Sequence, residues 1–140
     1  SIPEVVQADD QRLRQVFYNL LSNAAKFTPD HGEINISARL LSPDSDRLIV
    51  CSDKTVRLHE TQRNHIEFSV SDTGIGINPI HLEEMFKPFS QAQNRLRQEQ
   101  KGTGLGLSLV KEFVEIHYGK VWAESEGINK GTTIKFIIPV

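Results

Sequence analysis

The chain has 140 residues, of which 38% are hydrophobic and 24% charged, and this composition is typical of one globular domain rather than a disordered segment. Its formal net charge is −2 and no basic stripe runs along it, which argues against nucleic acid as its main partner. Cys51 is the single cysteine, so an internal disulfide framework is excluded and a reducing compartment such as the cytoplasm is favoured.

The sequence has no apolar run of membrane-spanning length and no signal peptide. It opens on Ser1 and enters a patterned segment almost at once, as a domain of a longer protein would. We therefore expect a single domain over residues 1–140, cytoplasmic and monomeric in isolation, whose parent protein could be anchored in a membrane.

The first predicted helix follows a short segment, Val5 to Ala8, that we expect to form an edge strand. Asp9 or Asp10 is placed to cap this helix, and a turn sequence at residues 28–32 ends it. Apolar residues recur at helical spacing and predict one buried face. They are Leu13, Val16, Phe17, Leu20, Leu21 and Ala24.

The other face of this helix carries Asn19, Asn23 and Lys26, with Phe27 in the last turn. Two amides and an ammonium on one face can hold a hydrated metal ion and its phosphates. An ordinary solvated face is the alternative, but such faces favour Glu and Lys over Asn, which is a poorer helix former. We therefore interpret this face as functional.

Three strands and a polar connection are predicted next. Glu33 to Leu41 alternates apolar and polar residues and predicts a strand, Arg47 to Cys51 predicts a returning strand, and residues 52–64 predict a polar hairpin or loop. Ile66 to Ser71 is the next predicted strand, and it leads into Asp72-Thr-Gly-Ile-Gly-Ile77. An Asp beside two glycines at a strand end can accept a hydrogen bond in a cleft while the backbone contacts a flat ligand; a plain Asp-x-Gly turn is the alternative.

Pro79 to Glu84 predicts a short helix with Asn78 as its N-cap. The segment 86–102 is polar except for its phenylalanines and has no apolar periodicity, so we expect a mobile lid over a site.

A glycine-rich loop follows and leads directly into a helix that ends near Tyr118, with Gly119 placed as a C-cap glycine. Its residues are Gly102, Thr103, Gly104, Leu105, Gly106 and Leu107. Such a loop directs free N–H groups and the positive end of a helix dipole at one point, which favours an anion and most often a phosphate. Neither the Walker pattern, nor G-x-G-x-x-G, nor the protein-kinase motifs occur in the sequence.

The chain ends in two predicted strands, Lys120 to Glu126 and Thr132 to Ile138, joined by a turn. The order of elements indicates an α/β fold. We expect a two-layer sandwich in which helices cover one face of a mixed, mostly antiparallel sheet.

Four segments together resemble the catalytic and ATP-binding domain of two-component sensor histidine kinases. They are residues 19–27 (the N box), 72–76 (the first glycine box), 86–89 (the F box) and 102–107 (the second glycine box). The resemblance covers nearly the whole chain and extends to the Bergerat-fold superfamily of gyrase, Hsp90 and MutL. It implies an enzyme that uses ATP and Mg²⁺ to phosphorylate a histidine on a separate dimerisation and phosphoacceptor domain, which in turn serves a response regulator.

The resemblance also implies roles for single residues. It makes Asn19, Asn23 and Lys26 the catalytic residues, and all three are implied at the ATP. Asn23 is implied as the Mg²⁺ ligand, Asn19 as a contributor to metal and phosphate binding, and Lys26 as a contact to phosphate. Phe27 resembles the aromatic wall beside the nucleotide, and Asp72 the carboxylate that accepts the adenine amino group. Gly74, Gly76 and Ile77 are implied at the base, and Gly102, Thr103, Gly104, Leu105, Gly106 and Leu107 at the phosphates.

Two departures bear on the reaction. ATP-hydrolysing members of the superfamily carry a Glu where this chain has Asn19, so transfer to a supplied nucleophile is favoured over hydrolysis. No histidine has the family's acceptor context, so we expect the acceptor elsewhere; the five are His31, His59, His65, His81 and His117. A Bergerat-fold ATPase and a non-catalytic nucleotide-sensing module remain as alternatives, although the intact boxes argue against the second.

Overall fold

The computed structural model describes residues 2–43, 48–50, 55–57, 62–88 and 106–140. Its helices are α1 (Asp10–Phe27), the 3-10 helices η1 (Pro79–His81) and η2 (Glu83–Phe86), and α4 (Gly106–Ile116). Its strands are β1 (Ile34–Leu41), β2 (Leu48–Val50), β3 (Thr55–Arg57), β4 (His65–Asp72), β5 (Lys120–Glu124) and β6 (Thr132–Pro139).

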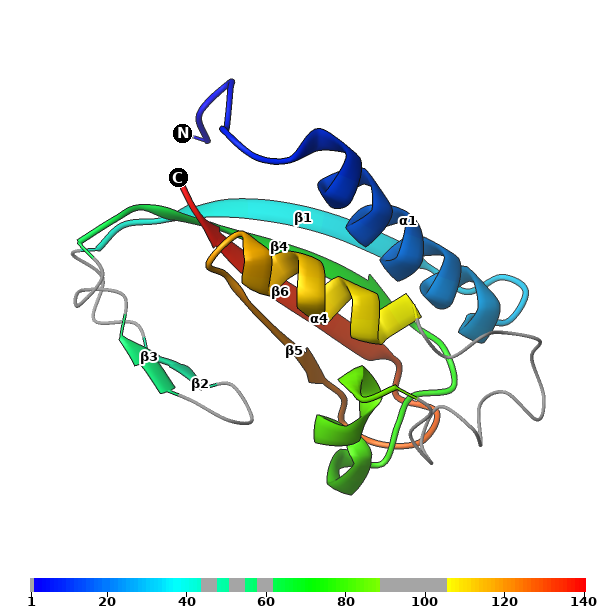
Figure 1. Ribbon diagram of the computed structural model, residues 1–140. Coiled ribbons are helices and arrows are strands. Elements are labelled where there is room, and N and C mark those ends of the chain that lie inside the picture. The colour runs from blue at the N-terminus through cyan, green and yellow to red at the C-terminus, as the bar shows by residue number, and fades with distance from the viewer. Residues whose placement is uncertain (1, 44–47, 51–54, 58–61, 89–105) are drawn as a thin grey trace.

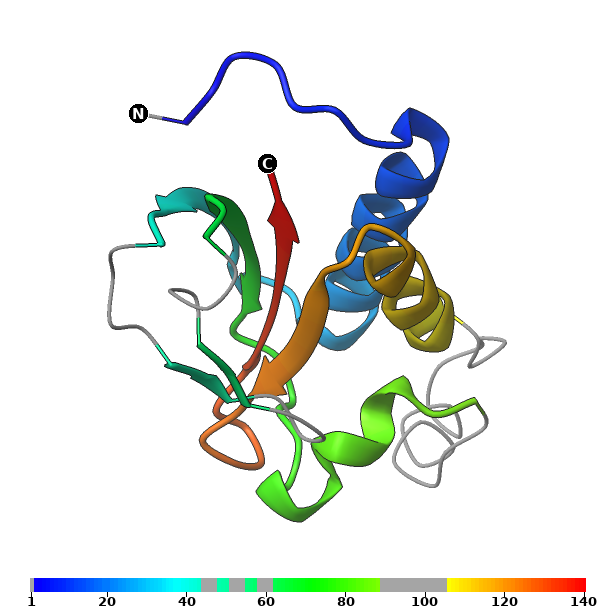
Figure 2. The same ribbon diagram turned by 60° about the vertical axis from the view of Figure 1, so that its left-hand side comes forward.

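Four strands form one sheet in the order β1-β4-β6-β5, and every neighbouring pair in it is antiparallel. Helices α1 and α4 lie side by side on one face of this sheet (Figures 1 and 2). The predicted two-layer α/β sandwich is therefore confirmed. The strand predicted over Arg47 to Cys51 is β2, which pairs with β3 in a separate two-stranded sheet rather than returning along β1.

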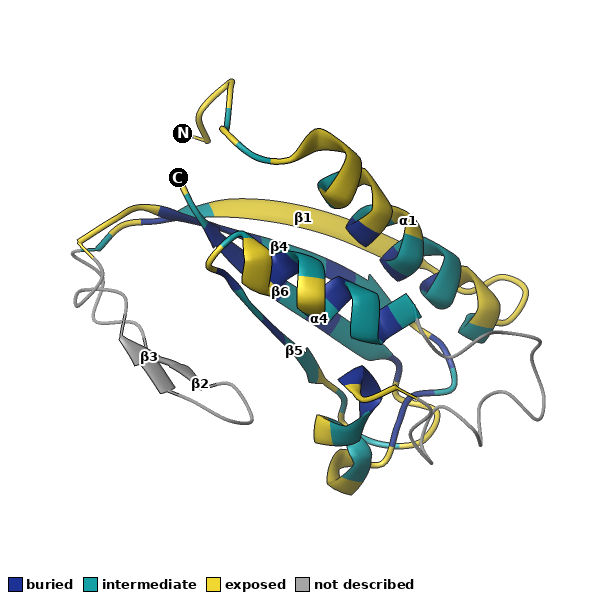
Figure 3. Ribbon diagram, in the orientation of Figure 1, coloured by how far each residue is buried: buried dark blue, intermediate teal, exposed yellow. Residues whose placement is uncertain are grey.

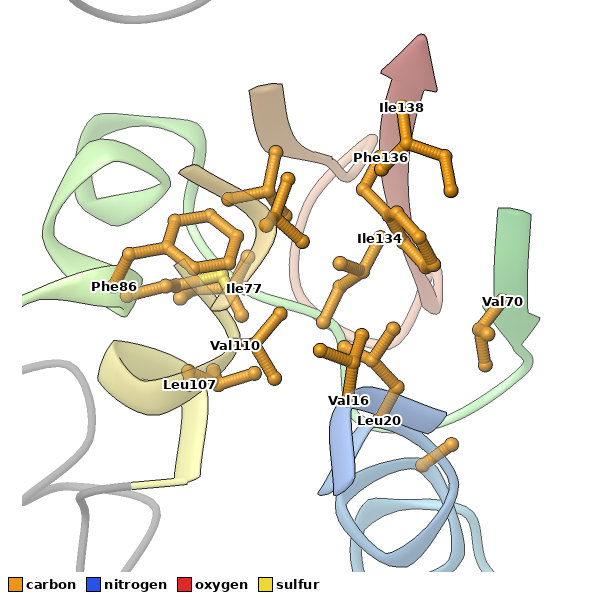
Figure 4. Packing of buried hydrophobic residues seen from close by; sticks show 14 residues of the cluster. Val16, Leu20, Val70, Ile77, Phe86, Leu107, Val110, Ile134, Phe136 and Ile138 are labelled. Carbon is orange, nitrogen blue, oxygen red and sulfur yellow. The ribbon is translucent and has the colours of Figure 1, made fainter. Parts of the chain in front are cut away.

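The hydrophobic core lies between the two helices and the sheet, and the helices keep their outer faces exposed (Figure 3). Val16 and Leu20 of α1 point toward Val110 of α4 and toward the side chains of β6 (Figure 4). Phe136 of β6 is fully buried at the centre and packs edge-on against Phe17, with ring centroids 5.5 Å apart. The helical stripe predicted for the first helix therefore faces the core, as its spacing requires.

Helix α1 begins where the sequence predicts. Asp9 is its N-cap, and Asp9 Oδ1 accepts the N–H of Arg12 at 3.0 Å. The N–H of Asp9 itself donates to Nε2 of His117, just beyond α4, at 2.9 Å. Residues 5–8 form no strand, so the edge strand predicted over Val5 to Ala8 was wrong.

At the end of α4, the residue that turns the chain is not the one that was predicted. Tyr118, not Gly119, takes the left-handed conformation, with φ of 60°. The N–H of Gly119 donates to the carbonyl of Val114 at 3.0 Å, and a Cβ on Gly119 would clash with the carbonyl oxygen of Ile137. A glycine is needed here because the turn lies directly against β6, not because of its φ.

Asn78 caps η1 as predicted, since its Oδ1 accepts the N–H of Ile80 at 3.2 Å. The helix predicted over Pro79 to Glu84 consists instead of two 3-10 turns and continues to Phe86, which is buried in the core. Residues 89–102 of the predicted lid lie outside the described residues.

No helix in the described parts of the chain is both long enough and apolar enough to cross a lipid bilayer.

His65 in β4 gives the fold a predictable pH dependence. It is 4% exposed, and its Nδ1 donates to the carbonyl of Arg63 at 3.0 Å. Burial lowers the pKa of His65, the bond to the Arg63 carbonyl opposes this, and the charge of Arg63 lowers the pKa further. The unfolded chain therefore takes up a proton at a higher pH than the folded chain. The contribution of the neutral, buried His65 to the free energy of unfolding is complete above the unfolded pKa and is lost as the pH falls through the folded pKa.

We therefore expect the free energy of unfolding, measured in urea at a series of pH values, to decline as the pH drops through the ordinary titration range of histidine. In the His65→Gln variant the decline should be smaller, because the amide does not titrate. If the variant and the parent lose stability in parallel, other groups govern the acid sensitivity.

Candidate functional site

The polar face of α1 meets the start of α4. Asn19 Nδ2 donates to the carbonyl oxygen of Gly106 at 3.2 Å, and Asn19 Oδ1 accepts the Nε2–H of Gln15 at 2.8 Å. Residues of the N box and of the second glycine box, 87 positions apart in the sequence, are thus in contact. Sequence reasoning missed Gln15, although a glutamine four residues before an asparagine on one helical face could have signalled this pair.

The last residue of β4, Asp72, holds its carboxylate in a fixed orientation. Asp72 Oδ1 accepts two backbone N–H groups, from Gly74 at 2.8 Å and from Thr132 at 3.3 Å. Oδ2 forms no hydrogen bond with the described part of the chain, and the residue is half-buried. Burial raises the pKa of Asp72, and the bonds from Gly74 and Thr132 oppose the rise. One oxygen is therefore anchored while the other remains able to accept a bond from a ligand.

The first glycine box lies against the last turn of α1. The N–H of Ile75 donates to the carbonyl of Phe27 at 3.1 Å, and a Cβ on Gly74 would clash with that same carbonyl oxygen. Gly76 has φ of 66°, and a Cβ there would clash with the carbonyl of Gly127. Sequence reasoning assigned these glycines to close contact with a flat base, but contacts within the chain already require both.

The other predicted residues fall into three groups. Asn23 and Phe27 are half-buried and Lys26 is exposed, and neither Asn23 nor Lys26 forms a side-chain hydrogen bond within the described residues. Ile77 and Leu107 are buried, and their side chains belong to the hydrophobic core (Figure 4). Gly102, Thr103, Gly104 and Leu105 lie outside the described residues.

The described residues contain no group of three or more His, Cys, Asp or Glu side chains that could hold a metal ion. From the described residues, an ion at this site could draw on amide oxygens, together with ligand phosphates and water. Mg²⁺ accepts such a set, because it prefers oxygen and keeps several waters. Asn23 fits this role better than Asn19, whose oxygen and nitrogen both already have partners in the chain.

Comparison with known proteins identifies the family of the chain. Residues 8–140 match the family described as histidine kinase-, DNA gyrase B-, and HSP90-like ATPases. Hybrid signal transduction histidine kinase D of Dictyostelium discoideum is 34% identical over 145 residues, which cover 100% of this chain and 9% of that protein.

Two solved structures resemble the chain throughout. The catalytic domain of histidine kinase ThkA is 30% identical with a TM-score of 0.66, covering 96% of this chain and 71% of that one. Full-length ShkA in complex with AMPPNP is 28% identical with a TM-score of 0.71, covering 99% of this chain and 23% of that one. The chain therefore belongs to the histidine kinase-, DNA gyrase B-, and HSP90-like ATPase family.

Proposed function

We propose that this chain is the catalytic and ATP-binding domain of a sensor histidine kinase. It binds Mg-ATP and transfers the γ-phosphoryl group to a histidine on a separate dimerisation and phosphoacceptor domain. The observation that carries the proposal is the meeting of three distant motifs in a chain that belongs to an ATPase family: Asn19 contacts Gly106, and Phe27 contacts the first glycine box. The domain works in the cytoplasm, where ATP and the response regulator are available.

Asp72 supplies the selectivity for adenine. Its Oδ1 is held by the N–H groups of Gly74 and Thr132, so Oδ2 is presented in a fixed direction. An adenine amino group can donate to this oxygen, whereas the carbonyl of guanine at the same place would set two acceptors against each other. The half-buried position strengthens both the attraction and the repulsion, because less water screens them.

The phosphates lie between the start of α4 and the polar face of α1. Gly106 is the first described residue of α4, and the start of a helix carries the positive end of its dipole, which attracts phosphate. Asn23 would hold Mg²⁺ together with the phosphates, and the exposed Lys26 would contribute a positive charge. When bound, the ion neutralises charge on the phosphate oxygens during transfer.

Asn19 favours transfer over hydrolysis. An amide cannot remove a proton from water, and Asn19 Nδ2 is already directed at the Gly106 carbonyl. The alternative of a Bergerat-fold ATPase is therefore not supported by this residue. The alternative of a nucleotide-sensing module would use the same pocket without transfer, but the relatives named above are kinases.

Calorimetric titration tests the proposed nucleotide site. With Mg²⁺ present, a non-hydrolysable ATP analogue should bind, and the matching GTP analogue should bind about five- to a hundredfold more weakly, since one unfavourable buried polar contact costs about 1–3 kcal/mol. Equal affinity for both analogues would refute selection by Asp72, and no binding of either would refute the function.

A further inference from the structure

Gln15 lies on α1 one turn before Asn19, with its side chain exposed except for one contact. That contact is the 2.8 Å hydrogen bond from Gln15 Nε2 to Asn19 Oδ1. The orientation of both amides follows from the Gly106 carbonyl, where this series of two hydrogen bonds ends. The Gly106 carbonyl can only accept, so the amide nitrogen of Asn19 must face it, and the Asn19 oxygen must then receive its bond from the nitrogen of Gln15.

The side chain of Asn19 lies directly beside Gly106. A Cβ built on this residue would have only the Cγ of Asn19 as a near neighbour, at 3.9 Å, apart from the chain on either side and the backbone of α4 itself. Gly106 is also the first residue of α4 and a glycine, which is the residue with the most backbone freedom to lose. The side chain of Asn19 thus adds a polar link between α1 and the first described residue of α4, beside the packing of Leu107 and Val110 in the core.

We propose that Gln15 is a positioning residue for the nucleotide site, acting through Asn19 on Gly106. This inference rests on the proposed function, because it concerns the phosphate end of the same site. Gln15 restricts the Asn19 side chain to the rotamer that reaches Gly106, and so lowers the entropy that would otherwise be lost when phosphate orders the start of α4. Gln15 itself touches neither nucleotide nor metal.

The relay of hydrogen bonds from Gln15 through Asn19 to Gly106 also gives the two asparagines, Asn19 and Asn23, different roles. The oxygen and the nitrogen of the Asn19 amide are both bonded within the protein, so loss of this side chain should weaken ATP binding equally with and without Mg²⁺. Asn23 has no such engagement in the described residues, so its loss should weaken only the metal-bound form.

The test replaces Gln15 by Met, which has a similar length, forms helices well and has no donor. Gln11 provides the matched control: it is exposed one turn earlier on α1 and makes no side-chain bond within the described residues. Gln15→Met should weaken binding of the ATP analogue with Mg²⁺ by about three- to tenfold, the range of one hydrogen bond, and Gln11→Met should not change it. Both nucleotide-free variants should remain folded in thermal unfolding, with Gln15→Met slightly less stable than Gln11→Met because the bond to Asn19 is present in the free protein.

A double-mutant cycle shows whether the effect passes through Asn19. In the Asn19→Ala background, Gln15→Met should cause no further loss of affinity. Additive losses would overturn the relay, and so would unchanged affinity in Gln15→Met while the parent chain binds normally.

A second readout needs no nucleotide. In the free protein, Gln15→Met should shift the side-chain amide signals of Asn19 in ¹H–¹⁵N spectra, and Gln11→Met should not. If the parent chain fails to bind ATP, the proposed function fails while this spectrum still decides the relay. Asn19 signals that are identical in the parent and in Gln15→Met would overturn it.

Discussion

Asp72→Asn is expected to lower the affinity of the chain for ATP by about ten- to a hundredfold, because a buried bond to a charged acceptor is worth about 1.5–3 kcal/mol. The amide keeps an oxygen that can accept from the N–H groups of Gly74 and Thr132. Its second group is then an NH₂, which faces the adenine amino group as donor against donor. The ligand bond is lost while the loop keeps its own bonds.

The fold should tolerate this change. Burial raises the pKa of Asp72, so the folded chain holds the proton more tightly than the unfolded chain. Stability therefore falls as the pH rises from the unfolded toward the folded pKa, and the charged carboxylate carries this cost at neutral pH. A neutral amide removes the cost, so urea unfolding of the variant at neutral pH should show equal or slightly greater stability.

Asp30→Asn is the matched control, since Asp30 is exposed in the turn after α1 and undergoes the same chemical change. Calorimetric titration should show full affinity for ATP in Asp30→Asn and the loss in Asp72→Asn. Unchanged affinity in Asp72→Asn would mean that this carboxylate serves only the loop.

Asn23→Ala should weaken Mg-ATP by about tenfold or more and metal-free ATP hardly at all, because only the former needs the amide oxygen. The side chain is half-buried on α1 and makes no hydrogen bond with the described residues, so its removal should cost the fold little. Titrations in the presence of Mg²⁺ and of a chelator measure the two affinities.

Asn19→Ala is the natural comparison, four residues earlier on the same face. Its losses with and without Mg²⁺ should be equal, since Asn19 is bonded to Gly106 rather than left available to a metal. If Asn23→Ala weakened Mg-ATP and metal-free ATP equally, Asn23 would have a structural role and would not be the ligand of the proposed metal site.

Much of the fold follows from local patterns in the sequence. The apolar stripe of α1, the cap at Asp9 and the strand that ends at Asp72 each depend on residues close together in the chain. The hydrogen bonds that form the candidate site depend instead on residues far apart in the sequence. Thr132 reaches Asp72 only through the register of β4 and β6, across 60 residues, and no spacing in the sequence signals that N–H.

The glycines show the same limit. Gly74 and Gly76 were recognised as positions that need close backbone approach, but their neighbours, Phe27 and Gly127, come from other segments. Gly119 was predicted to turn the chain after α4, whereas Tyr118 does so and Gly119 lies against β6. The glycines in the sequence indicated positions where the backbone comes close to something else. Only the tertiary structure shows which segment lies against each of them.

The central claim is that this chain holds ATP while another domain offers the histidine. It is tested by incubating the chain with γ-labelled ATP and Mg²⁺, alone and with the dimerisation and phosphoacceptor domain of its own parent protein. Transfer requires an imidazole within about 3–3.5 Å of the γ-phosphorus, in line. We predict acid-labile label on the acceptor domain and none on the chain alone. Acid-labile label on the isolated chain, or an unlabelled acceptor while the chain binds ATP, would contradict the account.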